Sequence, residues 1–224
     1  MKSFKNFFIF LLIVCVGIGT WRLYWTFVHE REVLNKIIER LNADSRAAEV
    51  LVTNVNYDEA TRKTYTTIKF LEYDTLGRPL ESKYFTFSGN IIQFQSLVVR
   101  YDDVLVGRGD ALKGKSAYLF WKVFMLDGKD TQVYDLSLVN TVPGGYKLST
   151  VTDPYEEKLW RNFWDYALNA RLAKKAGIKN AQIEAPGTIF IPGYLYTLKI
   201  EHDGGIRIDA KILPEILKGE KISP

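Results

Sequence analysis

The sequence predicts an α+β fold: a single N-terminal transmembrane helix and a helical stalk, followed by a mostly antiparallel β-sheet or partly closed barrel packed by one long α-helix. Three observations support this prediction. An apolar run fills residues 7–28, strand-forming segments separated by turns follow from about residue 47, and one clearly bounded helical pattern covers residues 154–176. No internal repeat is visible, so a single domain is expected beyond the N-terminal helix.

The N-terminal run from Phe7 to Val28 holds 22 residues and a single charged side chain, Arg22. A helix of this length rises about 33 Å, which is enough to cross the hydrocarbon core of a bilayer. Three aromatic residues gather at its C-terminal end, as they do at membrane interfaces, and Arg22 beside them can reach the headgroups. The residues expected to anchor the chain are Phe7, Trp21, Arg22, Tyr24 and Trp25.

A cleaved signal peptide is the alternative interpretation, because Lys2 and Lys5 precede the apolar core. Signal peptidases need small residues before the cleaved bond, whereas this run offers Val14, Val16 and Ile18. The apolar core is also longer than that of an ordinary signal. An uncleaved anchor is therefore favoured.

The charges that flank the span predict its orientation. Residues 1–6 carry Lys2 and Lys5 without an acidic residue, whereas the basic residues after the span are matched by glutamates. The N-terminus is therefore expected in the cytoplasm and the rest outside it, in the periplasm of a bacterium. The expected organisation is a cytoplasmic tail (1–6), a transmembrane anchor (7–28), an amphipathic stalk helix and linker (29–46) and an extracytoplasmic α+β domain (47–224).

Composition excludes several classes of function. The net charge is +4, but removing Lys2, Lys5 and Arg22 leaves 27 basic against 26 acidic residues, so no nucleic-acid partner is expected. The only cysteine, Cys15, lies in the span, so the chain forms no internal disulfide. With two histidines and a membrane-embedded cysteine, we expect neither a metal site nor a cofactor.

The predicted stalk has an apolar stripe. Val33 or Leu34, Ile37, Ile38 and Leu41 recur every three or four residues among charged ones. This stripe either packs on the domain or pairs with a second copy of the chain in a short coiled coil. Leu34 and Ile38 are therefore possible partner contacts, and self-association through the stalk stays open.

Strand-forming segments dominate the middle of the chain. Apolar and polar residues alternate in several of them, which indicates one buried and one exposed face. The run YLFWKVFML at 118–126 is apolar on both sides apart from Lys122, so it is expected to be a central, covered strand. The other predicted strands are 49–57, 64–73, 80–87, 91–100 and 133–140, and 194–201 with 206–212 form a final hairpin.

The predicted long helix has clear ends. Asp153 is its N-cap, Pro154 occupies the first helical position, and Lys174, Lys175 and Gly177 indicate the end. Its apolar face is expected to lie across the sheet. Two tryptophans of that face are the alternative candidates for contact with a partner or ligand: Trp160 and Trp164.

One motif resembles a nucleotide-binding loop. Gly109, Gly114, Lys115 and Ser116 satisfy G-x-x-x-x-G-K-S letter for letter. A phosphate-binding loop opens a helix, however, and the segment after Ser116 is aromatic and β-branched, which is typical of a strand. The motif is therefore interpreted as a chance match, and no cofactor is expected.

No catalytic residues are predicted. His29 lies beside the span, His202 lies at a hairpin end, and no serine stands in a nucleophile-elbow motif. Ser116 and Lys122 are of the right types for a serine–lysine dyad, but we do not predict that they are catalytic.

We therefore expect a membrane-anchored extracytoplasmic interaction or assembly module without catalytic activity. Its expected partners are the lipid bilayer and a protein of the cell envelope. Two alternatives remain: a binding domain for a small molecule or glycan, and a membrane-tethered hydrolase. The aromatic residues that suggest the ligand-binding alternative are Trp121, Trp160, Trp164 and Tyr194.

Overall fold

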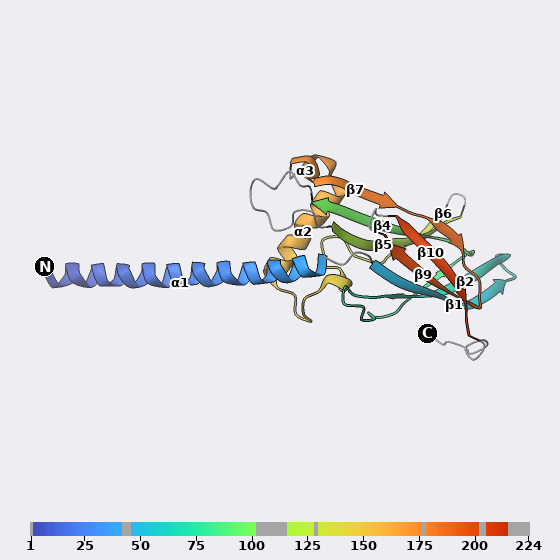
Figure 1. Cartoon of the computed structure of the whole chain (residues 1–224), viewed down its shortest axis with the longest axis horizontal. Helices are drawn as coiled ribbons and strands as arrows, with labels where there is room; N and C mark the ends of the chain where they lie inside the picture. Colours follow the sequence, from blue (N-terminus) through green and yellow to red (C-terminus); the bar gives the residue numbers. More distant parts are fainter. Residues whose placement is uncertain are drawn as a thin grey trace.

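One long helix leads into two antiparallel β-sheets, so the chain is α+β (Figure 1). Helix α1 (Lys2–Leu41) projects away from the sheets for most of its length, and its last turns lie beside helix α2 (Pro154–Leu168). The computed structural model describes residues 2–41, 46–101, 116–127, 130–175, 178–201 and 205–214. Since α1 has no break near residue 29, a separate stalk stays a prediction.

The two sheets have different strand orders. The first has the order β10-β9-β1-β2-β3, and the second has the order β6-β5-β4-β7 with β8 also paired to β4. The strands of the first sheet are β1 (Arg46–Asp58), β2 (Lys63–Glu72), β3 (Lys83–Phe87), β9 (Tyr194–Ile200) and β10 (Ile206–Ile212). Those of the second are β4 (Ile91–Tyr101), β5 (Ser116–Asp127), β6 (Asp130–Asp135), β7 (Ile178–Glu184) and β8 (Gly187–Ile189).

The alternative of a partly closed barrel is wrong for the strands that the structure describes. Strands β3 and β4 are consecutive in the chain but belong to different sheets. Between these two strands the Ser88 N–H donates a hydrogen bond to Gln132 Oε1 at 2.8 Å instead of joining a strand ladder. Alternation in a sequence indicates which face of a strand is apolar and not which strand it pairs with, so the division into two sheets could not be predicted.

The first core lies between the two sheets. Phe70 of β2 stacks on Phe94 of β4 with ring centroids 5.7 Å apart, and it meets Phe120 of β5 edge to face at the same separation. All three rings are buried in one cluster with side chains of both sheets. Large aromatic contacts of this kind hold the two sheets face to face.

The second core lies on the opposite face of the second sheet. Leu97 and Leu119 pack there with Phe163 and Trp164 of α2, and Ile37 of α1 joins the same cluster. Strands β4 and β5 are therefore covered on both faces, as the apolar run at 118–126 predicted for β5. The end of α1 is thus part of the folded core.

A bulge in β5 changes which side chains face which core. Gln95 pairs with Lys122 and Ser96 with Phe120, so Trp121 is the extra residue. Before the bulge Phe120 faces the first core, and after it Val123 does. The Trp121 carbonyl accepts hydrogen bonds from the Leu136 and Ser137 N–H groups. A bulge of this kind reverses the alternation without ending the strand.

The predicted helix at 154–176 begins where expected, but it is not continuous. It consists of α2 and a short helix α3 (Ala170–Lys175), separated by Asn169 in an extended conformation. Asn169 Oδ1 accepts hydrogen bonds from the Arg171 and Leu172 N–H groups, so it acts as the N-cap of α3. Asparagine competes for backbone donors in this way, which explains why the apolar pattern alone did not indicate the break.

Replacing Phe94 by alanine is expected to lower the free energy of unfolding by about 3–5 kcal/mol, because it removes the ring on which both sheets pack. Denaturant unfolding of the full chain in a nonionic detergent, followed by tryptophan fluorescence, measures this loss. Ile91→Ala is the matched control, since Ile91 lies in the same strand but is 57% exposed. A loss of similar size in both variants would contradict a core between the sheets.

Candidate functional site

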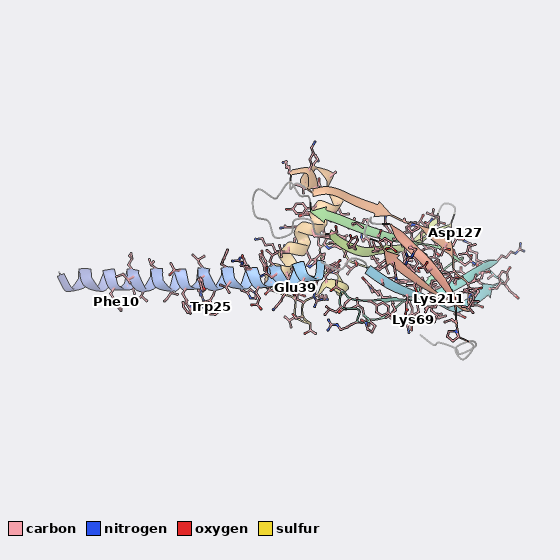
Figure 2. All side chains as sticks on the ribbon, in the orientation of Figure 1. Phe10, Trp25, Glu39, Lys69, Asp127 and Lys211 are labelled. Atoms are coloured by element: carbon pink, nitrogen blue, oxygen red, sulfur yellow. The ribbon has the colours of Figure 1, made fainter. Side chains whose placement is uncertain are left out.

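Helix α1 has two parts with different surroundings. Its apolar part projects free of the sheets, and Trp25 on it contacts no side chain of the domain (Figure 2). The stretch Phe10–Ile37 is long and apolar enough to cross a membrane, a property that a membrane anchor and a signal sequence share. The aromatic residues predicted to mark the interface, Trp21, Tyr24 and Trp25, are exposed. The turns that follow reach the domain.

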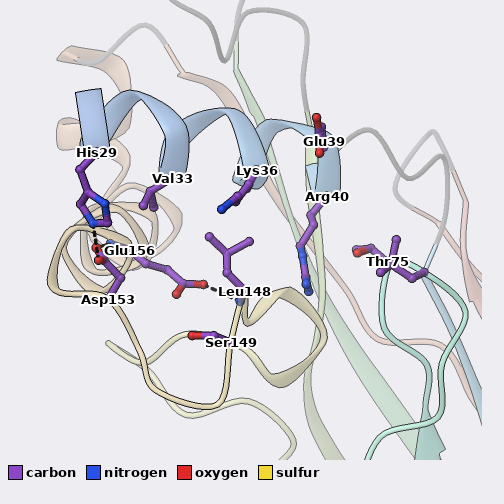
Figure 3. Close-up of a pocket in the computed structure, with 11 residues that line it drawn as sticks. His29, Val33, Lys36, Glu39, Arg40, Thr75, Leu148, Ser149, Asp153 and Glu156 are labelled. Atoms are coloured by element: carbon purple, nitrogen blue, oxygen red, sulfur yellow. Dashed lines mark hydrogen bonds and ion pairs between the residues drawn. The ribbon is translucent and has the colours of Figure 1, made fainter. Parts of the chain in front are cut away.

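A cavity of about 440 Å³ lies where α1 meets the domain (Figure 3). The last turns of α1 form one wall, the loop before α2 forms the opposite wall, and the turn at Thr75 and Leu76 closes the remaining side. The residues that line it are His29, Val33, Lys36, Glu39, Arg40, Thr75, Leu76, Leu148, Ser149, Asp153 and Glu156.

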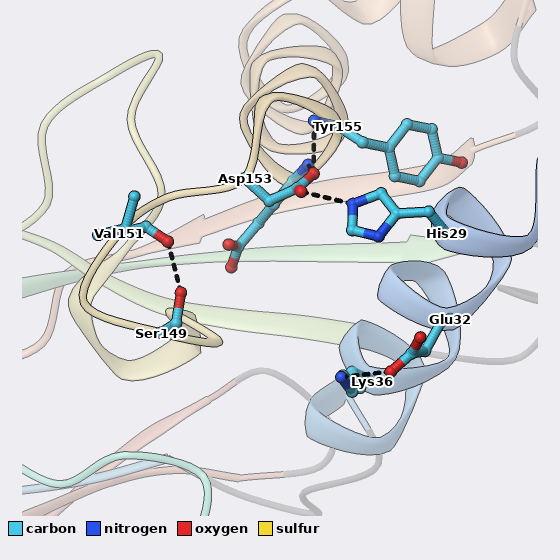
Figure 4. A network of polar contacts seen from close by, with 8 residues as sticks. His29, Glu32, Lys36, Ser149, Val151, Asp153 and Tyr155 are labelled. Atoms are coloured by element: carbon cyan, nitrogen blue, oxygen red, sulfur yellow. Dashed lines mark hydrogen bonds and ion pairs between the residues drawn. The ribbon is translucent and has the colours of Figure 1, made fainter. Parts of the chain in front are cut away.

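Asp153 and His29 join α2 to α1 at one end of the cavity. Asp153 is the N-cap of α2, and its Oδ1 accepts hydrogen bonds from the Tyr155 and Glu156 N–H groups at 2.8 and 3.3 Å. Its Oδ2 lies 2.6 Å from His29 Nε2 (Figure 4). Partial burial raises the pKa of Asp153, but the hydrogen bonds from His29 and the helix N-terminus outweigh it and hold the pKa below its ordinary value. Both oxygens of Asp153 are therefore occupied.

Glu156 is the one fully buried carboxyl group in the described part of the chain, with 0% of its surface exposed. Its Oε1 accepts a hydrogen bond from the Leu148 N–H at 3.1 Å, whereas Oε2 has no hydrogen-bond partner among the described residues. Burial raises the pKa of Glu156 above its ordinary value, against the opposing effect of the Leu148 and Asp153 N–H groups and of the Arg40 charge. The buried carboxyl group therefore tends toward its protonated form.

Two cations of α1 face the cavity. Lys36 pairs with Glu32 on the same helix at 2.7 Å. Arg40 extends from the helix toward the loop that carries Leu148 and Ser149 (Figure 3). Within the described residues its guanidinium has no ion pair closer than 4 Å. Thr75 Oγ1, on the third wall, is buried and likewise has no hydrogen-bond partner there.

The chemistry of these groups favours binding over catalysis. The hydroxyl of Ser149 donates to the Val151 carbonyl and approaches neither His29 nor Lys36 (Figure 4). His29 is held by Asp153. Neither Ser149 nor His29 therefore forms a nucleophile–base pair, whereas the Arg40 guanidinium has no ion pair and the Thr75 hydroxyl has no hydrogen bond among the described residues.

The residues predicted from the sequence lie elsewhere. Trp160 and Trp164 are buried in the second core, Trp121 packs against that core, and Tyr194 packs against the first. None of the four lines the cavity. Leu34 is half-buried on α1, while the side chain of Ile38 lies outside the part that the structure describes. The same is true of the Phe7 side chain among the predicted anchor residues.

The motif resembling a nucleotide-binding loop falls largely outside the described residues, which resume at Ser116. Ser116 begins strand β5, so the segment that follows is a strand and not the helix that such a loop opens. Ser116 and Lys122 are six residues apart on that strand, a separation of roughly 20 Å. They do not form a catalytic pair.

Sequence reasoning did not identify the cavity. Glu156 was visible only as an acidic residue in the first turn of a helix, and Arg40 only as a charge beside an apolar stripe. Thr75 comes from a turn about 80 residues before Glu156. The one available signal was His29, a polar residue at the end of the apolar run, but nothing in the sequence indicated that its partner is Asp153, 124 residues away.

A comparison with known proteins finds no matching family model, no matching curated protein and no matching solved structure. The arrangement of residues in the structure therefore carries the functional argument.

Glu156→Gln is expected to flatten the pH dependence of stability. A carboxyl group whose pKa is higher in the folded than in the unfolded chain stabilises the fold fully below its unfolded value, and this contribution is lost as the pH rises through the folded value. The free energy of unfolding of the native protein should therefore fall as the pH rises above 4.5, the ordinary value for glutamate. Denaturant unfolding at a series of pH values measures this fall.

The matched control is Glu157→Gln, since Glu157 is the exposed neighbour on the same helix. Glu157→Gln should keep the native pH dependence, whereas Glu156→Gln should be more stable than the native protein near neutral pH. Identical pH profiles for the native protein and Glu156→Gln would show that burial does not perturb Glu156.

Proposed function

We propose that the chain is a single-pass membrane-anchored interaction or assembly module whose domain lies outside the cytoplasm, in the periplasm if the source is a bacterium. One observation carries this proposal: a single unbroken helix has an exposed apolar part at one end and is packed into the core of the domain at the other. An exposed apolar surface of this length is typical of a segment that lies in lipid.

Attachment through the core distinguishes this arrangement from a flexible tether. Val33 and Ile37 are buried against α2, and His29 is bonded to the α2 cap. The domain therefore keeps a set orientation relative to the helix, and to the membrane in which the helix would lie. A set orientation and height are what a module needs in order to hold a protein partner near the membrane surface.

The basic residues before the span support the proposed orientation. Lys2 and Lys5 precede the apolar part without an acidic residue, and basic residues favour the cytoplasmic side. The same segment fits a signal sequence, but Val14, Val16 and Ile18 are bulky where a signal peptidase needs small residues. This pattern favours an uncleaved anchor.

A second candidate function is the binding of a small ligand. It is supported by the cavity of about 440 Å³ at the junction, which falls within the usual size range of ligand sites. Arg40 and Thr75, which line the cavity, belong to the same junction of α1 and the domain that sets the orientation of the domain. The two functions are therefore compatible in one molecule.

The orientation can be tested with alkaline phosphatase fused after residue 42 and, separately, after residue 224. This reporter needs disulfide bonds and is active only outside the cytoplasm. Both fusions are expected to be active in a bacterial host, and a green fluorescent reporter at the same positions should be dark after export through the Sec pathway. Inactive phosphatase at both positions would overturn the proposed topology.

The interaction function can be tested by crosslinking in intact membranes that contain the full chain. Ile37→Asp is expected to weaken a specific crosslinked protein adduct at least several-fold, because a buried charge releases α1 from the domain. Asn35→Asp, on the exposed side of the same helix, should leave the adduct unchanged. Resistance of the domain to protease confirms that each variant remains folded.

The absence of any discrete adduct from the native chain would contradict the interaction function. An adduct that persists equally in Ile37→Asp would show that the orientation of the domain does not matter for the partner.

A further inference from the structure

The cavity at the junction of α1 and the domain has more hydrogen-bond donors than it can pair internally. Arg40 brings a guanidinium with five N–H donors and, among the described residues, no ion-pair partner within 4 Å. Lys36 adds a second cation on the next turn toward the N-terminus of the helix, with its amine bonded to Glu32. Thr75 Oγ1 is buried on the far wall without a partner in the described part.

The carboxyl groups that line the same cavity do not accept hydrogen bonds from these donors. Asp153 is occupied by His29 and by the N-terminus of α2. Glu39 also lines the cavity, and its carboxylate lies toward the outer side of α1 (Figure 3). Glu156 is fully buried, and one of its oxygens has no partner among the described residues. Burial raises the pKa of this carboxyl group, and in its protonated form it would donate a hydrogen bond. An acceptor-rich ligand would satisfy all of these groups together.

From this arrangement we infer that the cavity is a binding site for a phosphate group, held by Arg40 and Lys36 from α1, with Thr75 and Glu156 completing its hydrogen bonds. A phosphate presents several acceptor oxygens in a small volume, and a guanidinium pairs with two of them at once. The buried Glu156 oxygen without a partner is the second observation, independent of the two cations, that points to a ligand here.

Two sources could supply this phosphate. His29, at the end of the cavity nearest the predicted span, is the first residue after that span, whereas Arg40 lies about 18 Å further along the helix than Val28. The cavity therefore begins at the level of the lipid headgroups and extends beyond them. A phospholipid headgroup drawn up from the bilayer and a soluble phosphate ester share the required chemistry. The lipid source rests on the proposed membrane anchorage, and the soluble source does not.

The test uses the full chain purified in a nonionic detergent, with two probes. In the first arm, native mass spectrometry records retention of phosphatidylglycerol, with diacylglycerol of the same acyl chains as the probe that lacks phosphate. In the second arm, isothermal titration calorimetry measures binding of inorganic phosphate. Neither arm depends on the orientation of the chain in a cell, so failure here is distinguishable from failure of the proposed topology.

Arg40→Gln is expected to weaken binding of whichever probe the native protein binds, phosphatidylglycerol or inorganic phosphate, by roughly tenfold to a hundredfold. This is the usual cost of losing a charge-assisted pair. Arg31→Gln is the matched control, because it removes the same charge from an exposed position of the same helix that does not line the cavity. General attraction of anionic lipid to the helix would fall equally in both variants. Thr75→Val should weaken binding a few-fold without changing the charge.

Retention of phosphatidylglycerol that depends on Arg40, with no binding of inorganic phosphate, identifies a lipid headgroup. Binding of inorganic phosphate that depends on Arg40 identifies a soluble phosphate ester. The proposal is overturned if neither probe binds, if diacylglycerol is retained as well as phosphatidylglycerol, or if Arg40→Gln and Arg31→Gln have equal effects. If Arg40→Gln unfolds the domain, the proposal is tested with a folded Thr75→Val variant instead. Unchanged binding of the probe by Thr75→Val would then overturn the proposal.

Discussion

The burial of Val33 and Ile37 of α1 against α2 is the contact on which the arrangement of the whole molecule depends. These two side chains lie on a helix whose preceding turns are apolar and exposed, so they connect a segment suited to lipid with a core shielded from water. Burying two aliphatic side chains contributes on the order of 3–6 kcal/mol. His29 and Asp153 add a polar contact at the edge of this interface, where it also completes the cap of α2.

The second β-sheet transmits this contact to the rest of the domain. One face of β4 and β5 packs on α2 and the end of α1, and the other packs on the first sheet through Phe94 and Phe120. The bulge at Trp121 shifts the alternation of β5, so that Phe120 before it and Val123 after it both face the first core. Displacement of α1 would therefore disturb the packing of α2 first and then that of the sheet against which α2 packs.

The cavity arises where this packing is incomplete. Three segments meet there, and the long polar side chains of α1 prevent them from closing against one another. Groups that would normally be paired or solvated remain without partners, among them the second oxygen of Glu156. Unpaired buried groups carry a free-energy cost that a ligand can remove, which supports ligand binding in this cavity.

The sequence by itself determined the local features of this protein. Hydrophobic length predicted a helix able to span a bilayer, alternation predicted most strands, and Asp153 with Pro154 predicted the start of α2, because each of these depends on residues close together in the chain. The tertiary structure alone decided the division into two sheets and the cavity. These depend on which strands pair and on contacts such as His29 with Asp153, 124 residues apart. Local patterns do not specify such contacts, since many partners of similar polarity would satisfy the same side chains equally well.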